Sequence, residues 1–209
     1  MINKGKVVYV KNKLQYIKEP NIYARKISLN NVRGKEILEN IGKELGSFLK
    51  VMIMSLKPEN ILEIGTGCGY ATSVILQASK DYPKKLITVE IDKERLYKTK
   101  KALSDYGYNN IEFVCQDMLA FLKKSKENYN FILLDANPFL YIEAFLEITK
   151  HQKKNDVLLV HDALIPSIPI APTELKAAMD EFNCFLKDQD EYKIHKIALG
   201  DGFWFCIKN

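Results

Sequence analysis

The sequence has no long apolar run, because no stretch of 18 consecutive apolar side chains occurs in its 209 residues. A helix needs about 20 such residues to span a bilayer, so no transmembrane helix is expected. The amino terminus reads MINKGKVVYVKNKLQ, and lysines lie on both sides of its short apolar stretch VVYV. A secretory signal peptide has a longer apolar segment, so we expect a cytoplasmic protein that does not associate with membranes.

Cysteine and histidine are also scarce, with four and three residues respectively. The cysteines are far apart in the sequence, and neither a CxxC motif nor a Cys/His cluster occurs. This excludes the usual zinc-binding motifs and a disulfide framework. We expect free thiols buried in the core at Cys68, Cys115, Cys184 and Cys206.

The sequence has no strong excess of one charge overall, with a net charge of +5, but the charge is unevenly spread. Residues 1–50 contain 11 Lys/Arg and 4 Glu, a net of +7, so the other residues sum to −2. A basic amino-terminal segment is compatible with an anionic partner such as RNA. It is also compatible with the solvated surface of helices.

Internal repeats and low-complexity segments are absent, and from residue 60 onward apolar runs alternate with helical patterns near 70–80, 93–106, 118–126 and 139–150. Runs such as FILLDA and VLLV are almost continuously apolar, which is typical of strands buried on both faces of a parallel sheet. The alternation predicts an α/β fold with a doubly wound sheet. The expected strands are Asn60–Gly65, Lys85–Ile91, Ile111–Asp117, Tyr129–Ala136 and Asp156–Asp162.

The carboxyl-terminal end breaks this alternation. A helix near 173–187 is followed by YKIHKIAL and FWFCIK, which are joined by the turn Gly200-Asp201-Gly202. Two such runs around a glycine turn predict an antiparallel hairpin, and hence a mostly parallel sheet of seven strands. We expect one domain over 1–209, with a helical cover over 1–59 and the sheet core over 60–209.

A glycine-rich loop, Gly65-Thr66-Gly67-Cys68-Gly69, lies where the first strand passes into a helix. Its spacing is GxGxG, and Tyr70 stands where the dinucleotide-binding pattern GxGxxG needs its last glycine. A helix amino terminus still offers free N–H groups to an anion. The carboxylate of the methionine part of S-adenosylmethionine is such a group.

Acidic and amide side chains end the next two strands. Glu90 is 21 residues after Gly69, where a carboxylate can accept hydrogen bonds from both hydroxyls of a ribose. Gln116 and Asp117 end the third strand, beside the expected position of an adenine. Together with the glycine loop, they predict a site for S-adenosylmethionine at the carboxyl edge of the sheet.

With these residues in place, the chain resembles the class I S-adenosylmethionine-dependent methyltransferases, and within them the catechol and caffeoyl-CoA type O-methyltransferases and their bacterial relatives. The resemblance covers the chain from about residue 39 to its end. It rests on Asn40-Ile41-Gly42 with Gly46, LEIGTGCGYAT, FILLDAN with Asp135, Tyr141, VLLVHDAL with Asp162, and the closing segment LGDGFWFCIK.

The resemblance implies a Rossmann-like fold, S-adenosylmethionine as methyl donor, a small hydroxylated acceptor and a homodimer. It also implies that Asp135 and Asp162 act in catalysis and bind a divalent cation such as Mg²⁺, which lowers the pKa of the acceptor hydroxyl. The implied cofactor-binding residues are Ile41, Glu63, Gly65, Thr66, Gly67, Gly69, Tyr70, Glu90, Ile91, Gln116, Asp117 and Asp135.

Two departures from the family pattern bear on the chemistry. The family's third metal ligand is an asparagine, and here Ala163 takes its place; Pro138 stands where a lysine usually acts as an acid–base group. His161 directly precedes Asp162 and could replace the missing ligand or base. This requires that the side chains of His161 and Asp162 point to the same side of the strand. Because side chains alternate along a strand, we expect the two to face opposite sides.

Three functions therefore stay open. The first is O-methylation of a small hydroxylated acceptor. The second is methylation of hydroxyuridine in tRNA, which bacterial relatives carry out and which the basic amino-terminal segment favours. The third is a degenerate protein that binds the cofactor without catalysis, which Ala163 and Pro138 favour.

Overall fold

The structure, a computed structural model, describes residues 46–82, 84–105 and 110–209. Most of the expected amino-terminal cover, including Ile41, lies outside the described residues. The part that is described, 46–56, is helical as expected. No helix in these three ranges is long and apolar enough to cross a membrane.

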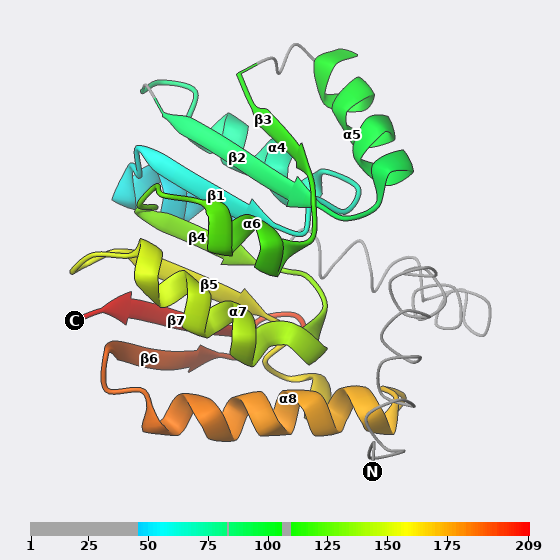
Figure 1. The fold of residues 1–209 in the computed structure, drawn as a ribbon, viewed down its shortest axis with the longest axis vertical. Helices are drawn as coiled ribbons and strands as arrows, with labels where there is room; N and C mark the ends of the chain where they lie inside the picture. The colour runs from blue at the N-terminus through cyan, green and yellow to red at the C-terminus, as the bar shows by residue number, and fades with distance from the viewer. Residues whose placement is uncertain (1–45, 83, 106–109) are drawn as a thin grey trace.

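The described residues form a seven-stranded sheet in the order β3-β2-β1-β4-β5-β7-β6 (Figure 1). Strands β1 to β5 are parallel, and β7 pairs antiparallel with both β5 and β6. This confirms the predicted fold class. The strands are β1 Asn60–Ile64, β2 Lys85–Glu90, β3 Glu112–Cys115, β4 Phe131–Leu134, β5 Val157–His161, β6 Tyr192–Ile197 and β7 Phe203–Lys208.

Helices connect the strands, as the hydrophobic periodicity predicts. Besides helix 46–56, the α-helices are α4 Tyr70–Ala78, α5 Lys93–Asp105, α6 Met118–Lys124, α7 Tyr141–Ile148 and α8 Thr173–Phe185. Short 3-10 helices follow or precede them at η1 Pro138–Leu140, η2 Thr149–His151, η3 Ile165–Ser167 and η4 Leu186–Asp188.

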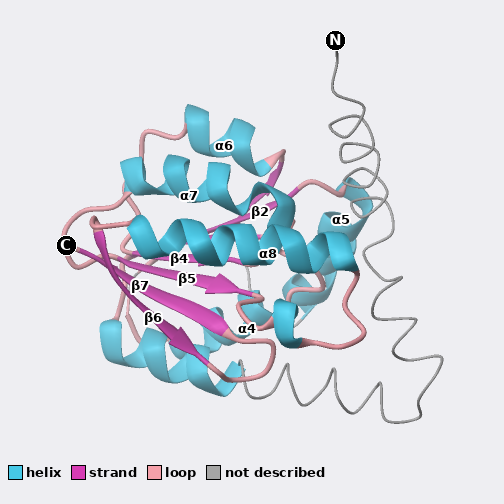
Figure 2. Ribbon diagram, turned by 90° about the horizontal axis from the view of Figure 1, so that it is seen from below, coloured by secondary structure: helices cyan, strands magenta, loops and turns pink. Residues whose placement is uncertain are grey.

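The helices cover both faces of the sheet, with α6 and α7 on one side of the strands and α4 on the other (Figure 2). The central strands β1, β2, β4 and β5 are buried on both faces, because their side chains alternate between two apolar clusters. In β5, Leu158 and Val160 belong to the cluster with α6, α7 and α8, whereas Val157 and Leu159 belong to the cluster with α4 and helix 46–56.

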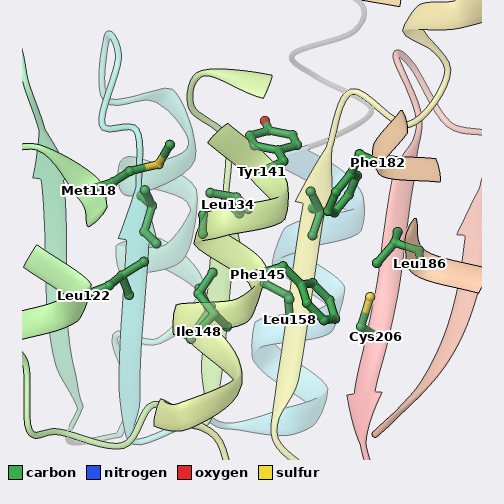
Figure 3. Close-up of a cluster of buried hydrophobic side chains, with 14 of the residues drawn as sticks. Met118, Leu122, Leu134, Tyr141, Phe145, Ile148, Leu158, Phe182, Leu186 and Cys206 are labelled. Atoms are coloured by element: carbon green, nitrogen blue, oxygen red, sulfur yellow. The ribbon is translucent and has the colours of Figure 1, made fainter. Parts of the chain in front are cut away.

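Aromatic side chains fill the larger cluster between the sheet and α7 and α8 (Figure 3). The ring centroid of Phe182 lies 5.5 Å from that of Tyr141 and 6.3 Å from that of Phe145. The buried Tyr141 hydroxyl also lies 3.3 Å from the backbone nitrogen of Ala136 and 3.4 Å from its oxygen. This contact fixes the loop that carries Asp135 to the core.

One expectation about the core was wrong. Cys206 is buried, but Cys68, Cys115 and Cys184 are exposed. Cys68 lies in a loop, Cys115 ends the short strand β3 and Cys184 lies near the end of α8. At such positions a cysteine is not buried merely because its side chain is apolar.

Candidate active site

Those predicted site residues that the structure describes lie where the parallel strands β1 to β5 end. Because these strands are parallel, their carboxyl ends meet at one edge of the sheet, which is where open α/β sheets bind ligands. Hydrogen bonds between successive loops tie this edge together. The backbone nitrogens of Gly65 and Asp135 donate to the carbonyl oxygens of Val89 and Ile64, respectively, each at 2.9 Å.

The glycine loop adopts backbone conformations that favour glycine, with φ of 99° at Gly65, 54° at Gly67 and 81° at Gly69. A Cβ atom at Gly65 would overlap the carbonyl oxygen of Asp135. A Cβ atom at Gly67 would have no described atom within 4 Å. Gly65 is therefore required by the packing of two loops, whereas the space beside Gly67 is filled by no described residue, so that a ligand can approach the backbone there.

Glu90, at the end of β2, is 6% exposed and connects three segments. Its carboxylate accepts from the backbone nitrogens of Gly67 at 3.1 Å and Asp92 at 3.0 Å. Arg95 Nη1 lies 3.6 Å from the same carboxylate. Glu90 thus positions the glycine loop, and its remaining lone pairs are available to ribose hydroxyls.

Glu63 is fully buried at the end of β1 and belongs to a chain of hydroxyl groups. Thr72 and Thr88 both donate to its Oε2 at 2.6 Å. Because Thr88 has one hydroxyl proton and gives it to Glu63, Thr66 donates in turn to Thr88 at 2.6 Å. Burial raises the pKa of Glu63 to about 7, although the hydrogen bonds from both threonines oppose this.

The other predicted cofactor residues line the same edge with different exposures. Tyr70 begins α4 and Ile91 follows Glu90; they are 40% and 45% exposed, respectively. The backbone nitrogen of Gln116 donates to Glu90 O at 3.0 Å. Asp117 caps α6 by accepting from Ala120 N at 3.0 Å, so it has a structural role that its position in the sequence did not indicate.

Asp135, His161 and Asp162 form a compact group at the ends of β4 and β5. The distance from His161 Nδ1 is 3.0 Å to Asp135 Oδ1 and 3.3 Å to Asp162 Oδ1. One ligand atom from each residue lies within 4.8 Å of the other two. Among the His, Cys, Asp and Glu side chains of the described residues, these three are close enough together to bind one metal ion.

The expectation that His161 faces away from Asp162 was wrong. Leu134 pairs with Val160 in the β4–β5 ladder, so Asp135 and His161, one residue further on, lie side by side. Asp162 has a φ of 73°, a left-handed conformation outside the strand region. This turn reverses the alternation and brings the Asp162 carboxylate back to the side of His161.

Charge and burial act together on this group. Burial alone lowers the pKa of His161, but the nearby carboxylates of Asp135, Asp162 and Asp201 outweigh it and raise the pKa to about 10. For Asp162, burial and the neighbouring carboxylates raise the pKa to about 7, while His161 opposes the shift. These opposing shifts follow from the close approach of the imidazole to the carboxylates of Asp135 and Asp162.

The donor set fits a divalent cation. Two carboxylates and an imidazole are common ligands of such ions, and the two charges of the carboxylates balance the ion. The two positions that depart from the family pattern, Ala163 and Pro138, provide no side-chain atom that can bind a metal ion. Ala163 is fully buried and offers only a methyl group, and Pro138 begins η1 after the cap Asn137.

Comparison with known proteins gives a consistent result. The sequence matches the model of a protein family described as O-methyltransferase over residues 12–209. An Arabidopsis thaliana protein provisionally named a caffeoyl-CoA O-methyltransferase is 25% identical over 214 residues, covering 92% of this chain and 91% of that protein. Catechol O-methyltransferase B of Danio rerio is 25% identical over 168 residues, covering 77% of this chain and 63% of that protein.

Among solved structures, the SAH-bound methyltransferase PaMTH1 of Podospora anserina superposes with a TM-score of 0.74. The alignment covers 100% of this chain and 97% of that chain at 17% sequence identity. The two chains therefore share the seven-stranded fold with its antiparallel carboxyl-terminal hairpin.

Proposed function

Because the chain belongs to the O-methyltransferase family, we propose that it transfers the methyl group of S-adenosylmethionine to the hydroxyl of a small acceptor. The observation that carries this proposal is the meeting of the glycine loop, Glu90 and Asp135 at one sheet edge. In the reaction, an acceptor oxygen attacks the methyl carbon, the carbon–sulfur bond breaks and its electron pair stays on sulfur. The hydroxyl proton passes from the acceptor oxygen to solvent water.

The residues around the glycine loop would hold the methyl donor. The open face of Gly67 suits the methionine carboxylate, and Glu90 accepts hydrogen bonds from ribose hydroxyls. The exposed side chains of Tyr70 and Ile91, together with Gln116, would contact the remaining parts of the cofactor. Glu63 and Thr66 act beneath the loop, since their hydrogen bonds lie inside the protein.

Asp135 and Asp162 would hold a divalent cation. When bound, such a cation orients the acceptor oxygen and favours its ionised form. This role matters here because Pro138 cannot accept a proton and no other base is assigned. A phenol-like hydroxyl with a pKa near 10 is mostly neutral at pH 7 and reacts slowly without assistance.

The experiment is incubation of the full chain with methyl-labelled S-adenosylmethionine and separate pools of small hydroxylated compounds and unmodified tRNA. Each pool is tested with a divalent cation and with excess chelator. Label in the small-compound pool, lost with chelator, supports the proposal. Label in tRNA alone supports methylation of hydroxyuridine in tRNA. Tight cofactor binding without methyl transfer to any pool supports a degenerate protein that binds the cofactor without catalysis.

A further inference from the structure

The group Asp135, His161 and Asp162 differs from the ligand set that the family resemblance implies. That set has two aspartates and an asparagine, and all three provide oxygen. Here the third position is Ala163, whose buried methyl group has no donor atom. The imidazole nitrogen of His161 instead lies between the two carboxylates.

The spacing of these donors suits one ion. Two ligands at right angles on an ion about 2.1 Å away are roughly 3.0 Å apart. The distances from His161 Nδ1 to the carboxylate oxygens are 3.0 Å and 3.3 Å, so small side-chain adjustments are enough to place an ion among them. Among the described residues, the polar partners of this nitrogen are the two carboxylates, so its lone pair points at the site once its proton has been lost.

The imidazole is held in this orientation by its surroundings. His161 is 9% exposed as a residue, and its ring centroid lies 5.3 Å from that of Phe203, its neighbour on β7. Its other nitrogen, Nε2, is buried and has no hydrogen-bond partner among the described residues. The polar interactions of the ring are therefore made through Nδ1, on the side of Asp135 and Asp162.

The residue types then determine which ions are preferred. Mg²⁺ favours hard oxygen ligands, whereas first-row transition ions such as Mn²⁺, Fe²⁺, Co²⁺ and Zn²⁺ also bind imidazole nitrogen well. We propose that His161 is the third protein ligand of a metal site with Asp135 and Asp162, and that this site binds a divalent transition ion more tightly than Mg²⁺. The role of that ion in methyl transfer rests on the proposed function, but its binding does not.

Metal binding is measured directly on the chelator-treated full chain, with Co²⁺ followed by its visible absorption and Mg²⁺ by competition. We expect one Co²⁺ per chain and an affinity for Co²⁺ at least about tenfold higher than for Mg²⁺. His161→Asn should weaken Co²⁺ binding by about tenfold or more and change Mg²⁺ binding much less. His195→Asn, at an exposed histidine on β6, is the matched control and should bind both ions as the wild type does.

Binding of S-adenosylmethionine is measured by calorimetry on the same proteins, so failure of the cofactor site and failure of the metal site are separate results. If His161→Asn does not fold, Asp162→Asn tests the same site and should also lose Co²⁺ binding. Equal Co²⁺ binding by wild type and a folded His161→Asn protein would overturn the proposal. So would equal or tighter binding of Mg²⁺, or no Co²⁺ binding by a chain that binds the cofactor.

Discussion

His161 Nδ1 lies 3.0 Å from Asp135 Oδ1, although 26 residues separate them in the sequence. The contact exists because β4 and β5 are paired in register, with Leu134 opposite Val160. It joins the aspartate nearest the glycine loop to the histidine and aspartate that end β5. The cofactor side and the metal side of the candidate site are thus parts of one hydrogen-bonded edge.

Glu90→Ala should weaken the binding of S-adenosylmethionine by about tenfold or more. Hydrogen bonds to a charged acceptor contribute roughly 1.5–3 kcal/mol each, and the ribose hydroxyls would lose theirs. The variant also loses the contact with Gly67 N that positions the loop. Calorimetry checks this, with Glu94→Ala on the exposed surface of α5 as control. Wild-type affinity in Glu90→Ala would remove Glu90 from the site.

Gly65→Ala should mainly reduce the stability of the protein, whereas Gly67→Ala should mainly reduce its affinity for S-adenosylmethionine. At Gly65 the added methyl overlaps the Asp135 carbonyl, so we expect strong destabilisation in a thermal melt. At Gly67 there is space in the protein, and the left-handed backbone costs an alanine about 1 kcal/mol. That variant should fold and bind S-adenosylmethionine more weakly, and Gly67→Val should exclude it. Normal cofactor binding by both Gly67 variants would contradict the loop assignment.

The stability of the cofactor-free protein should depend on the ionisation of Glu63. Its pKa is raised from 4.5 in the unfolded chain to about 7 in the folded protein, so the folded state holds this proton more tightly. The stabilisation is therefore complete below about pH 4.5 and is lost as the pH rises through 7, by up to about 3 kcal/mol.

Glu63→Gln should remove this part of the pH dependence, because glutamine does not ionise. Denaturant unfolding of both proteins between pH 5 and pH 8 measures the difference. Glu59→Gln, at an exposed position, is the matched control. Parallel curves for wild type and Glu63→Gln would show that Glu63 does not titrate in this range.

Asp162→Asn should reduce methyl transfer by about a hundredfold or more while leaving cofactor affinity within a few-fold of wild type. Asparagine is tolerated in the left-handed conformation at this position, so the loop should keep its shape. Initial rates with a labelled methyl donor, with and without chelator, check this, and exposed Asp180→Asn is the control. Full activity of Asp162→Asn in excess chelator would exclude the metal-assisted mechanism.

A homodimer, which the family resemblance implies, stays a prediction. Light scattering at micromolar concentration should give a mass of about 48 kDa, twice the 24.1 kDa of one chain. A mass near that of one chain would contradict it.

The sequence by itself determined the features that depend on neighbouring residues. Buried parallel strands appear as apolar runs, so FILLDA and VLLV could be placed as β4 and β5. The turn Gly200-Asp201-Gly202 joins β6 and β7 because glycine suits its left-handed backbone. Glu90 could be placed at the carboxyl edge of the sheet, because it ends the strand that follows the glycine loop.

Only the tertiary structure decided how side chains from different strands meet. Alternation correctly describes Val157 to Val160, but it does not extend to Asp162, whose left-handed backbone lies beyond the strand. The contact between His161 and Asp135 depends on the register of two strands, which no local pattern specifies. The sequence alone therefore predicts two acidic candidate ligands at the sheet edge, whereas strand pairing and one left-handed residue place a histidine between them.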